Sequence, residues 1–253
     1  MAVLCVFARN RYEELVPTKD AKNREDAKKN NMQIGVNSML FDLDGTLIDS
    51  RTDLANSINL MLADLDRPPL DESVVGGFVG DGVRVLVYRC LTATDPKSQP
   101  PEDTLHTRGI ALMHAHYAEE MLKTTTLYPQ VAETLAALRN KSKAVVTSKE
   151  VRFTRIILDH FDIAQYFEAI VGGDTTPARK PDPRPVLEAL RMLGASATGT
   201  VMIGDSENDI NAGRRAGTRT CGVTFGFRTA EQLRLSEPDM MIDRFDQLNE
   251  VYQ

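Results

Sequence analysis

Four aspartates in two closely spaced pairs are the residues of this sequence best suited to chemistry. Asp42 and Asp44 lie in FDLDGTLIDS at the end of an apolar run, and Asp205 and Asp209 lie in GDSENDI after another apolar run. Buried like charges are unfavourable unless a cation or a proton compensates them. Two such pairs in one crevice would form an oxygen-rich site of the kind that Mg²⁺ prefers. Taken separately, each pair could instead cap the turn or helix that follows it.

The spacing within each pair predicts that its two carboxylates point the same way. Alternate side chains of a strand share a face, so Asp42 and Asp44 project together while Leu43 turns toward the core. Asp205 and Asp209 are four residues apart where a helix is expected to begin. They would therefore share one face of its first turn.

Hydrogen-bond donors suited to an anionic substrate follow two further apolar runs. Thr147 and Ser148 end the run KAVVTS just before an expected helix, and Lys180 stands in the proline-rich loop ARKPDPRP. Hydroxyl groups, a helix amino terminus and an ammonium group can all bind phosphate oxygens. Each residue also has an ordinary alternative role as a helix cap or a solvated side chain. Their significance therefore depends on meeting at one site.

Short apolar runs that alternate with helical patterns predict the elements that position these residues. The expected strands cover residues 38–43, 143–148, 169–173, 200–205, 218–225 and 240–242. Continuous apolar runs are typical of strands that are covered on both faces, so we predict an α/β fold with a doubly wound, Rossmann-like parallel sheet. In such sheets the functional crevice lies beyond the carboxyl ends of the strands, where the candidate residues fall.

The alternation breaks after the first strand, where only helical stretches are evident. We interpret residues 53–126 as a helical cap domain inserted into a catalytic core of residues 38–52 and 127–253. Residues 1–37 would form an N-terminal extension that is disordered or partly helical, because residues 17–33 are polar and poor in apolar spacing.

Composition and charge argue against several classes of function. A formal net charge of −6 provides no basic surface for nucleic acid or an anionic membrane. No apolar stretch reaches the roughly 18 residues of a membrane helix, and we identify no export signal. Cys5, Cys90 and Cys221 are far apart, which favours a reducing compartment over a disulfide framework. We expect a cytoplasmic monomer or homodimer that binds a small phosphorylated metabolite and neither nucleic acid nor membrane.

Taken in order, four of these stretches resemble the motifs of the haloacid dehalogenase superfamily of phosphatases. They are DLDGT, the region of Thr147, Lys180 in RKPDP, and GDSENDI, and the resemblance runs from Met39 to the C-terminus. The chain looks most like the phosphoglycolate phosphatase group, through LIDS, VGDGVRVLVYRCL and VMIGDSENDINAGRRAGTRTCGVTFGF. Ser148 departs from the pattern, because an asparagine often follows the threonine there.

The resemblance implies hydrolysis of a small phosphomonoester through an aspartyl-phosphate intermediate. Asp42 would attack phosphorus. Asp44 would protonate the leaving group and later activate water. Thr147 and Lys180 would bind the phosphoryl oxygens, and Ser148 would make a peripheral contact.

The resemblance also implies Mg²⁺ as the cofactor. Its ligands would be Asp42, the backbone carbonyl of Asp44 and Asp205, with Asp209 supporting this metal site. Four aspartates are thus the candidate metal-site residues.

The glycine-rich stretch GGFVGDGVR, residues 76–84, is where we expect the cap to reach the substrate. Its candidate substrate-binding residues are Gly80, Asp81, Gly82 and Arg84. Arg84 could pair with a carboxylate such as that of 2-phosphoglycolate. The alternative interpretation is a turn that begins a helix, with Arg84 in solvent.

The residue types exclude some reactions of this superfamily but leave several substrates open. Asp44 argues against a dehalogenase, because a departing halide needs no proton. Residues 50–95 contain no lysine for a phosphonatase-type Schiff base, and no histidine of the mutase type follows the first motif. Hydrolysis of 2-phosphoglycolate is the leading prediction. Nucleoside monophosphates, pyrophosphate and sugar-acid phosphates stay open as substrates, as does a non-catalytic phosphate-binding module.

Overall fold

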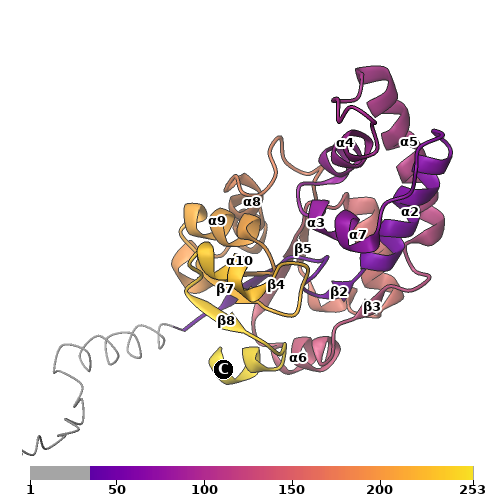
Figure 1. The fold of residues 1–253 in the computed structure, drawn as a ribbon. Helices are drawn as coiled ribbons and strands as arrows, with labels where there is room; N and C mark the ends of the chain where they lie inside the picture. The colour runs from indigo at the N-terminus through magenta and orange to yellow at the C-terminus, as the bar shows by residue number, and fades with distance from the viewer. Residues whose placement is uncertain (1–34, 253) are drawn as a thin grey trace, which may run out of the picture. The chain divides into compact units, whose positions relative to one another are not determined.

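The computed structural model describes residues 35–252, in which strands and helices alternate as predicted (Figure 1). Most of the predicted N-terminal extension, residues 1–34, lies outside the described residues. The strands are β1 Ser38–Phe41, β2 Ile48–Asp49, β3 Thr126–Leu127, β4 Ser142–Val146, β5 Ala169–Val171, β6 Thr200–Gly204, β7 Arg219–Val223 and β8 Met240–Ile242. The α-helices are α2 Arg51–Ala63, α3 Glu72–Phe78, α4 Val83–Ala93, α5 Asp103–Glu120, α6 Val131–Ala137, α7 Val151–His160, α8 Arg184–Leu193, α9 Glu207–Ala216, α10 Ala230–Leu235 and α11 Gln247–Val251. Two short 3₁₀ helices are η1 Ala164–Tyr166 and η2 Ala197–Gly199.

A parallel sheet with the strand order β5-β4-β1-β6-β7-β8 forms the centre of the described chain. β1 is flanked by β4 and β6, so Leu40 lies opposite both Ala144 and Met202. The predicted doubly wound α/β fold is confirmed. Because parallel neighbours end at the same edge, the residues that follow β1, β4 and β6 are brought together.

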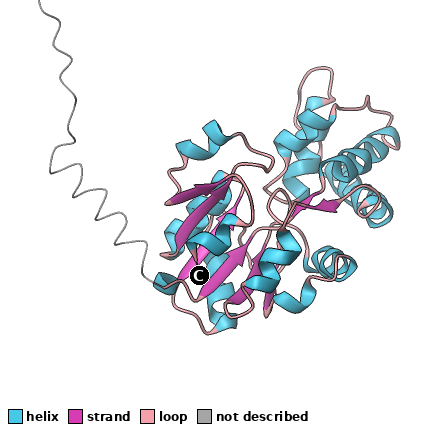
Figure 2. Cartoon of the chain, turned by 90° about the horizontal axis from the view of Figure 1, so that it is seen from below, coloured by secondary structure: helices cyan, strands magenta, loops and turns pink. Residues whose placement is uncertain are grey.

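Both faces of the sheet are covered by helices, as Figure 2 shows. On one face, Leu40 belongs to a buried cluster with residues of α8 and α9, including Val186 and Ala212. On the other face, the Phe41 ring lies edge-on to Phe167, with ring centroids 6.0 Å apart. This two-sided burial is why the strands carry continuous apolar runs.

The chain between β2 and β3 is helical, as predicted, and contains α2, α3, α4 and α5. In Figure 1 these helices gather beside one another, and α5 packs against both α2 and α4. β2 and β3 pair antiparallel, with Ile48 opposite Leu127, so the chain enters and leaves the helical segment at adjacent positions. Residues from Val36 onward form one compact unit. A separate cap domain of residues 53–126 therefore stays a prediction.

Asp53 fixes the point where the helical segment returns to the sheet. Its fully buried carboxylate accepts hydrogen bonds from the backbone N–H groups of Thr124 and Thr125, at 3.0 and 2.8 Å, and from both hydroxyls, each at 2.7 Å. Burial opposes ionisation, but these hydrogen bonds outweigh it and hold the pKa of Asp53 below its usual value.

The first prediction is that Asp53→Asn destabilises the fold by about 2–3 kcal/mol at pH 7, because an amide nitrogen would face hydrogen-bond donors. The folded-state pKa of Asp53 is lowered, so its stabilisation is present above the unfolded pKa of about 4 and is lost as pH falls through the folded value. Urea unfolding at pH 7 and at pH 3 measures both effects. The difference between wild type and variant should shrink at pH 3. Asp66→Asn is the control, since Asp66 is exposed and its φ of 53° suits asparagine. An equal deficit at both pH values would contradict the prediction.

Candidate active site

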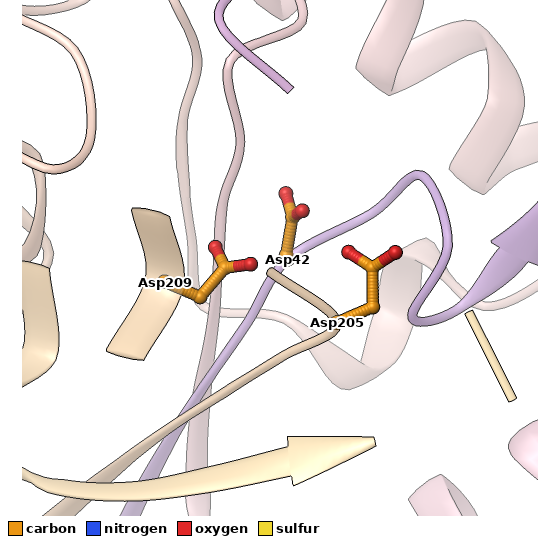
Figure 3. A group of neighbouring side chains, drawn as sticks. All are labelled: Asp42, Asp205 and Asp209. Atoms are coloured by element: carbon orange, nitrogen blue, oxygen red, sulfur yellow. The ribbon is translucent and has the colours of Figure 1, made fainter. Parts of the chain in front are cut away.

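Three carboxylates meet at the carboxyl ends of β1 and β6 (Figure 3). One oxygen each of Asp42, Asp205 and Asp209 lies within 4.8 Å of the others. Asp42 follows β1, Asp205 follows β6, and Asp209 lies in the first turn of α9. The structure therefore brings the two predicted acidic stretches into one cluster.

Burial and mutual repulsion disfavour the ionised forms of this cluster. Burial is the main cause that raises the pKa of Asp42 to about 7; Asp209 and Asp44 add to the rise, and Lys180 opposes it. Burial, followed by the charges of Asp209 and Asp42, raises the pKa of Asp205 well above its usual value. A bound cation would favour the ionised forms of Asp42 and Asp205.

Lys180 supplies one positive charge to this cluster. Its Nζ lies 2.9 Å from Asp42 Oδ1 and 2.5 Å from Asp209 Oδ1, and it donates to the carbonyl of Val146 at 2.7 Å. Burial opposes the charge of Lys180, but Asp209 and Asp42 outweigh burial and raise its pKa. Asp209 Oδ2 accepts hydrogen bonds from the backbone N–H and the hydroxyl of Ser206, at 3.1 and 2.6 Å. Asp209 is thus engaged through both oxygens, which favours its predicted supporting role.

The remaining carboxylate oxygens fit a divalent cation that prefers oxygen ligands. Asp42 Oδ2 and Asp205 Oδ1 take part in none of the contacts above, whereas Asp205 Oδ2 accepts a hydrogen bond from the backbone N–H of Phe227 at 2.6 Å. A Cβ at Gly45 would lie 2.2 Å from Asp205 Oδ2, and Gly45 has a φ of +83°, so only glycine lets the backbone after Asp44 approach Asp205. Buried carboxylates beside a close backbone segment suit Mg²⁺.

Asp44 is held by a different set of partners. Its Oδ1 accepts hydrogen bonds from Ser50 Oγ at 2.5 Å and from Lys149 Nζ at 2.7 Å. Lys149 Nζ also donates to the hydroxyl of Tyr117 in α5 and lies 4.6 Å from the centroid of that ring. Asp44 is therefore connected, through one buried lysine, to the helical segment.

The end of β4 places Thr147 and Ser148 beside the acidic cluster. The Thr147 N–H donates to the carbonyl of Val171 at 2.9 Å, which aligns this turn with β5. Thr147 Oγ1 accepts a hydrogen bond from the backbone N–H of Lys149 at 3.2 Å. Ser148 Oγ is buried and has no hydrogen-bond partner among the described residues.

A pocket is lined by the sheet-end residues and by part of the helical segment. From the sheet ends come Asp42, Asp44, Thr147, Ser148 and Asp205. From the helical segment come Leu54, Val79, Gly80, Gly82, Val83, Leu86, Met113, His114 and Tyr117.

Two of the predicted cap residues, Asp81 and Arg84, do not line this pocket. Asp81 instead pairs with Arg89 at 2.7 Å, and Arg84 is exposed. Val83 and Leu86 turn toward the pocket, and each helical residue is rotated by about 100° from the one before. Arg84 therefore points away, which corrects its predicted position.

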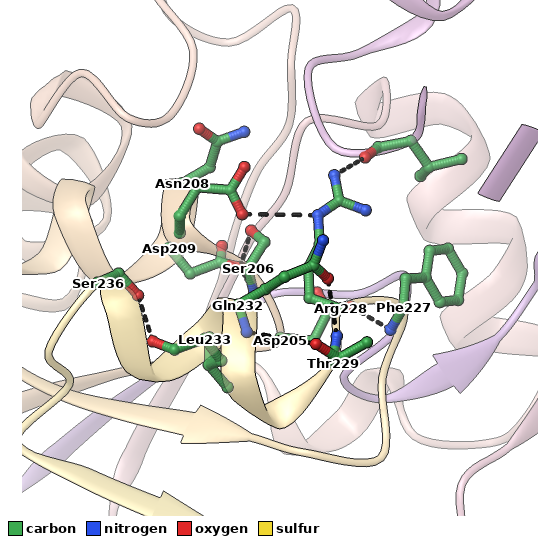
Figure 4. A network of polar contacts seen from close by, with 12 residues as sticks. Asp205, Ser206, Asn208, Asp209, Phe227, Arg228, Thr229, Gln232, Leu233 and Ser236 are labelled. Atoms are coloured by element: carbon green, nitrogen blue, oxygen red, sulfur yellow. Dashed lines mark hydrogen bonds and ion pairs between the residues drawn. The ribbon is translucent and has the colours of Figure 1, made fainter. Parts of the chain in front are cut away.

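Side chains near the acidic cluster also contact the segment between α3 and α4. Figure 4 shows two of these side chains, Arg228 and Asn208, near Asp205 and Asp209. Arg228 donates to the carbonyl of Val79 at 2.8 Å, and Asn208 Nδ2 donates to Asp81 Oδ1 at 2.9 Å. Asp81 thus contributes to the position of the segment rather than to the pocket wall.

The sequence from residue 39 to residue 223 matches the family model of haloacid dehalogenase-like hydrolases. The chain belongs to this family. The predicted superfamily is confirmed, as is the class of enzyme, a phosphoric monoester hydrolase.

The similarity to known proteins extends over most of this chain. The hydrolase is 38% identical to a phosphoglycolate phosphatase of Pseudomonas putida, over 81% of this chain and 75% of that protein. It is 35% identical to a phosphoglycolate phosphatase of Colwellia psychrerythraea, over 83% of this chain and 94% of that protein. The crystal structure of a predicted phosphoglycolate phosphatase from Haemophilus somnus 129pt superposes with a TM-score of 0.81 at 32% identity, covering 86% of this chain and 98% of the other.

Sequence reasoning missed Lys149, Tyr117 and Arg179 as pocket residues of this hydrolase. Lys149 and Arg179 each stand next to a residue that the motifs do mark, Ser148 and Lys180. That adjacency is the only sequence signal for them, because a lysine or arginine in a loop is usually solvated.

In residues 35–252, no helix has both the length and the apolar character that crossing a membrane requires.

Proposed function

We propose that this hydrolase cleaves 2-phosphoglycolate to glycolate and phosphate through an aspartyl-phosphate intermediate, with Mg²⁺ as cofactor. The observation that carries the proposal is the meeting of Asp42, Asp205 and Asp209 within 4.8 Å at the end of the sheet. The relatives named phosphoglycolate phosphatase support the substrate.

In the proposed reaction, Asp42 attacks phosphorus in line while the bond from phosphorus to the ester oxygen breaks. Asp44 gives its proton to the departing oxygen, and the phosphoryl group remains on Asp42. Asp44 then takes a proton from water as the water oxygen attacks phosphorus, and the bond from phosphorus to the Asp42 oxygen breaks, which releases phosphate and restores the Asp42 carboxylate. Lys149 would hold Asp44 in position through the 2.7 Å contact between Nζ and Oδ1.

Asp42 and Asp205, with the backbone carbonyl of Asp44, would hold the Mg²⁺ ion. When bound, it would offset the repulsion between the carboxylate of Asp42 and the anionic phosphoryl group. Lys180 and Thr147 would bind the phosphoryl oxygens, on which charge is spread in the transition state.

The size of the pocket supports a small substrate. Its volume is about 80 Å³, against about 10–15 Å³ for a single enclosed water.

Cys90 and Cys221 are buried free thiols, which suits a reducing compartment, so we place the reaction in the cytoplasm.

The second prediction, which tests the proposal, concerns the order of kcat/KM across a substrate panel. 2-Phosphoglycolate should exceed pyrophosphate, nucleoside monophosphates and sugar-acid phosphates by about tenfold or more, because a selective polar site typically discriminates by at least this factor. Phosphate release is measured with and without added Mg²⁺. A higher value for any other member would overturn the proposed substrate. No turnover of any phosphoester would favour the phosphate-binding module instead.

The third prediction is that Asp44→Asn accumulates phosphorylated enzyme. The asparagine cannot activate water, so the second step slows more than the first, especially with p-nitrophenyl phosphate, whose leaving group needs little protonation. Acid-quenched enzyme should carry close to one labile phosphate per chain. Asp49→Asn is the matched control, because Asp49 pairs with Arg51 and does not line the pocket. Detection of no enzyme-bound phosphate in Asp44→Asn, with turnover persisting, would count against the two-step scheme.

A further inference from the structure

Arg179 lines the pocket and has no ion-pair partner among the described residues. Among the other pocket-lining lysine and arginine side chains, Lys149 pairs with Asp44 at 2.7 Å, and Arg228 lies 3.5 Å from Glu207. Arg179 forms no ion pair with any residue from 35 to 252, and its buried Nε has no hydrogen-bond partner there. A buried donor without an acceptor is energetically unfavourable. An acceptor supplied by a ligand would remove this cost.

The position of Arg179 depends on two glycines. A Cβ at Gly82 would lie 3.0 Å from Arg179 Nε, and a Cβ at Gly173 would lie 3.1 Å from the same atom. Gly82 precedes α4 and has a φ of +85°, whereas Gly173 follows β5. The side chain of Arg179 therefore enters the pocket between the end of the sheet and the helical segment.

Ser148 adds a second unmet polar group to the same pocket. Its Oγ is buried without a partner among the described residues, and its backbone carbonyl lies 3.3 Å from the position of a Cβ at Gly82. Arg179 and Ser148 thus both pack around Gly82. A guanidinium and a hydroxyl together suit a carboxylate, which accepts several hydrogen bonds.

The location of this pair favours the leaving group over the transferring phosphoryl group. In-line attack places the leaving group on the far side of phosphorus from Asp42. Lys180, 2.9 Å from Asp42, is the residue that the proposed function assigns to the phosphoryl oxygens. Arg179 instead contacts Gly82 on the wall that the helical segment supplies. In 2-phosphoglycolate the leaving group carries a carboxylate on the carbon that bears the ester oxygen.

We propose that Arg179, assisted by Ser148, binds a carboxylate on the leaving group and so selects acidic phosphomonoesters. This inference rests on the proposed function and assigns to Arg179 the role that the sequence suggested for Arg84. Arg179 would then determine substrate specificity, whereas Asp42 and Asp44 would carry out the chemical steps at phosphorus.

The test compares 2-phosphoglycolate with 2-hydroxyethyl phosphate, which replaces the carboxylate by a neutral hydroxymethyl group. Arg179→Gln should lower kcat/KM for the acid by about ten- to a hundredfold, the loss typical of a hydrogen bond to a charged group. Its kcat/KM for the neutral ester should stay within about threefold of wild type, which also shows that the variant folds. Arg179→Lys, which keeps the charge without the planar fork, should show a smaller selective loss. Arg155→Gln, on the exposed part of α7, is the matched control.

Two results would overturn the inference. One is an equal loss on both esters in Arg179→Gln, which would assign Arg179 to the phosphoryl group or to folding. The other is a selective loss in Arg84→Gln but not in Arg179→Gln. If wild type preferred another acidic phosphomonoester, the proposed substrate would be wrong. Arg179 would then be tested by the ratio of kcat/KM for 3-phosphoglycerate to kcat/KM for glycerol 1-phosphate. A ratio in Arg179→Gln equal to that of wild type would refute the role of Arg179.

Discussion

Asp42→Asn is expected to abolish phosphate release, with kcat lower by a factor on the order of 10⁴ or more, as is typical when a nucleophile is removed. The asparagine keeps the shape of the side chain but cannot form the aspartyl-phosphate. Steady-state phosphate release from 2-phosphoglycolate and from p-nitrophenyl phosphate should be lost in parallel, because the nucleophile serves every substrate.

The folding of Asp42→Asn separates lost chemistry from lost structure. Burial is the main cause that raises the pKa of Asp42 to about 7. A carboxylate with a raised pKa reduces stability as pH rises from its unfolded value, about 4, through the folded value. Asp42→Asn should therefore unfold in urea at pH 8 no more easily than wild type. Asp162→Asn, at an exposed turn, is the control for the substitution itself. Retained turnover above a hundredth of wild type would refute Asp42 as nucleophile.

Lys180→Met is expected to lower both activity and stability, which distinguishes it from Asp42→Asn. Removal of the ammonium leaves the buried carboxylates of Asp42 and Asp209 without the cation that lies 2.9 and 2.5 Å from them. We expect kcat/KM to fall by about 10²–10³-fold, since the proposed role of Lys180 is to stabilise charge on the phosphoryl oxygens. Removing one partner of a buried ion pair typically costs about 3–5 kcal/mol.

The pH dependence of that stability loss provides a further check. The carboxylate of Asp42, whose pKa is raised by burial, can take up a proton, so the deficit of Lys180→Met should be smaller at pH 5 than at pH 8. Urea unfolding at both pH values without metal measures it. Lys97→Met, an exposed lysine in the loop between α4 and α5, should match wild type at both. A deficit that is absent, or larger at pH 5, would mean that Lys180 does not neutralise this cluster.

Strands that carry continuous apolar runs were the most predictable part of the fold. β1 and β6 are buried on both faces, so their sequences, SMLF and TVMIG, indicate their environment directly. α3 was not predicted, because its sequence ESVVGGF contains two glycines, which disfavour a helix by about 1 kcal/mol each. Packing of α3 against α2 and α4 outweighs that preference.

The acidic site was predictable because its residues follow directly from strand ends. Asp42 and Asp205 could be placed from the sheet alone, since neighbouring parallel strands end at one edge. The position of Arg84 could not be predicted, because it depends on which side of α4 faces the pocket. Val83 and Leu86 lie on that side, so Arg84 does not. Arg179 was hidden for a similar reason: only the tertiary contacts with Gly82 and Gly173 show that this loop arginine enters the pocket.

The most direct test of the acidic site is a crystal structure with Mg²⁺ and beryllium fluoride, which stands in for a phosphoryl group on aspartate. We predict beryllium bonded to an oxygen of Asp42, and Mg²⁺ about 2.1 Å from oxygens of both Asp42 and Asp205. Asp209 should keep its contact with Lys180. Beryllium on another residue, or Asp205 more than about 4 Å from the ion, would contradict the site described above.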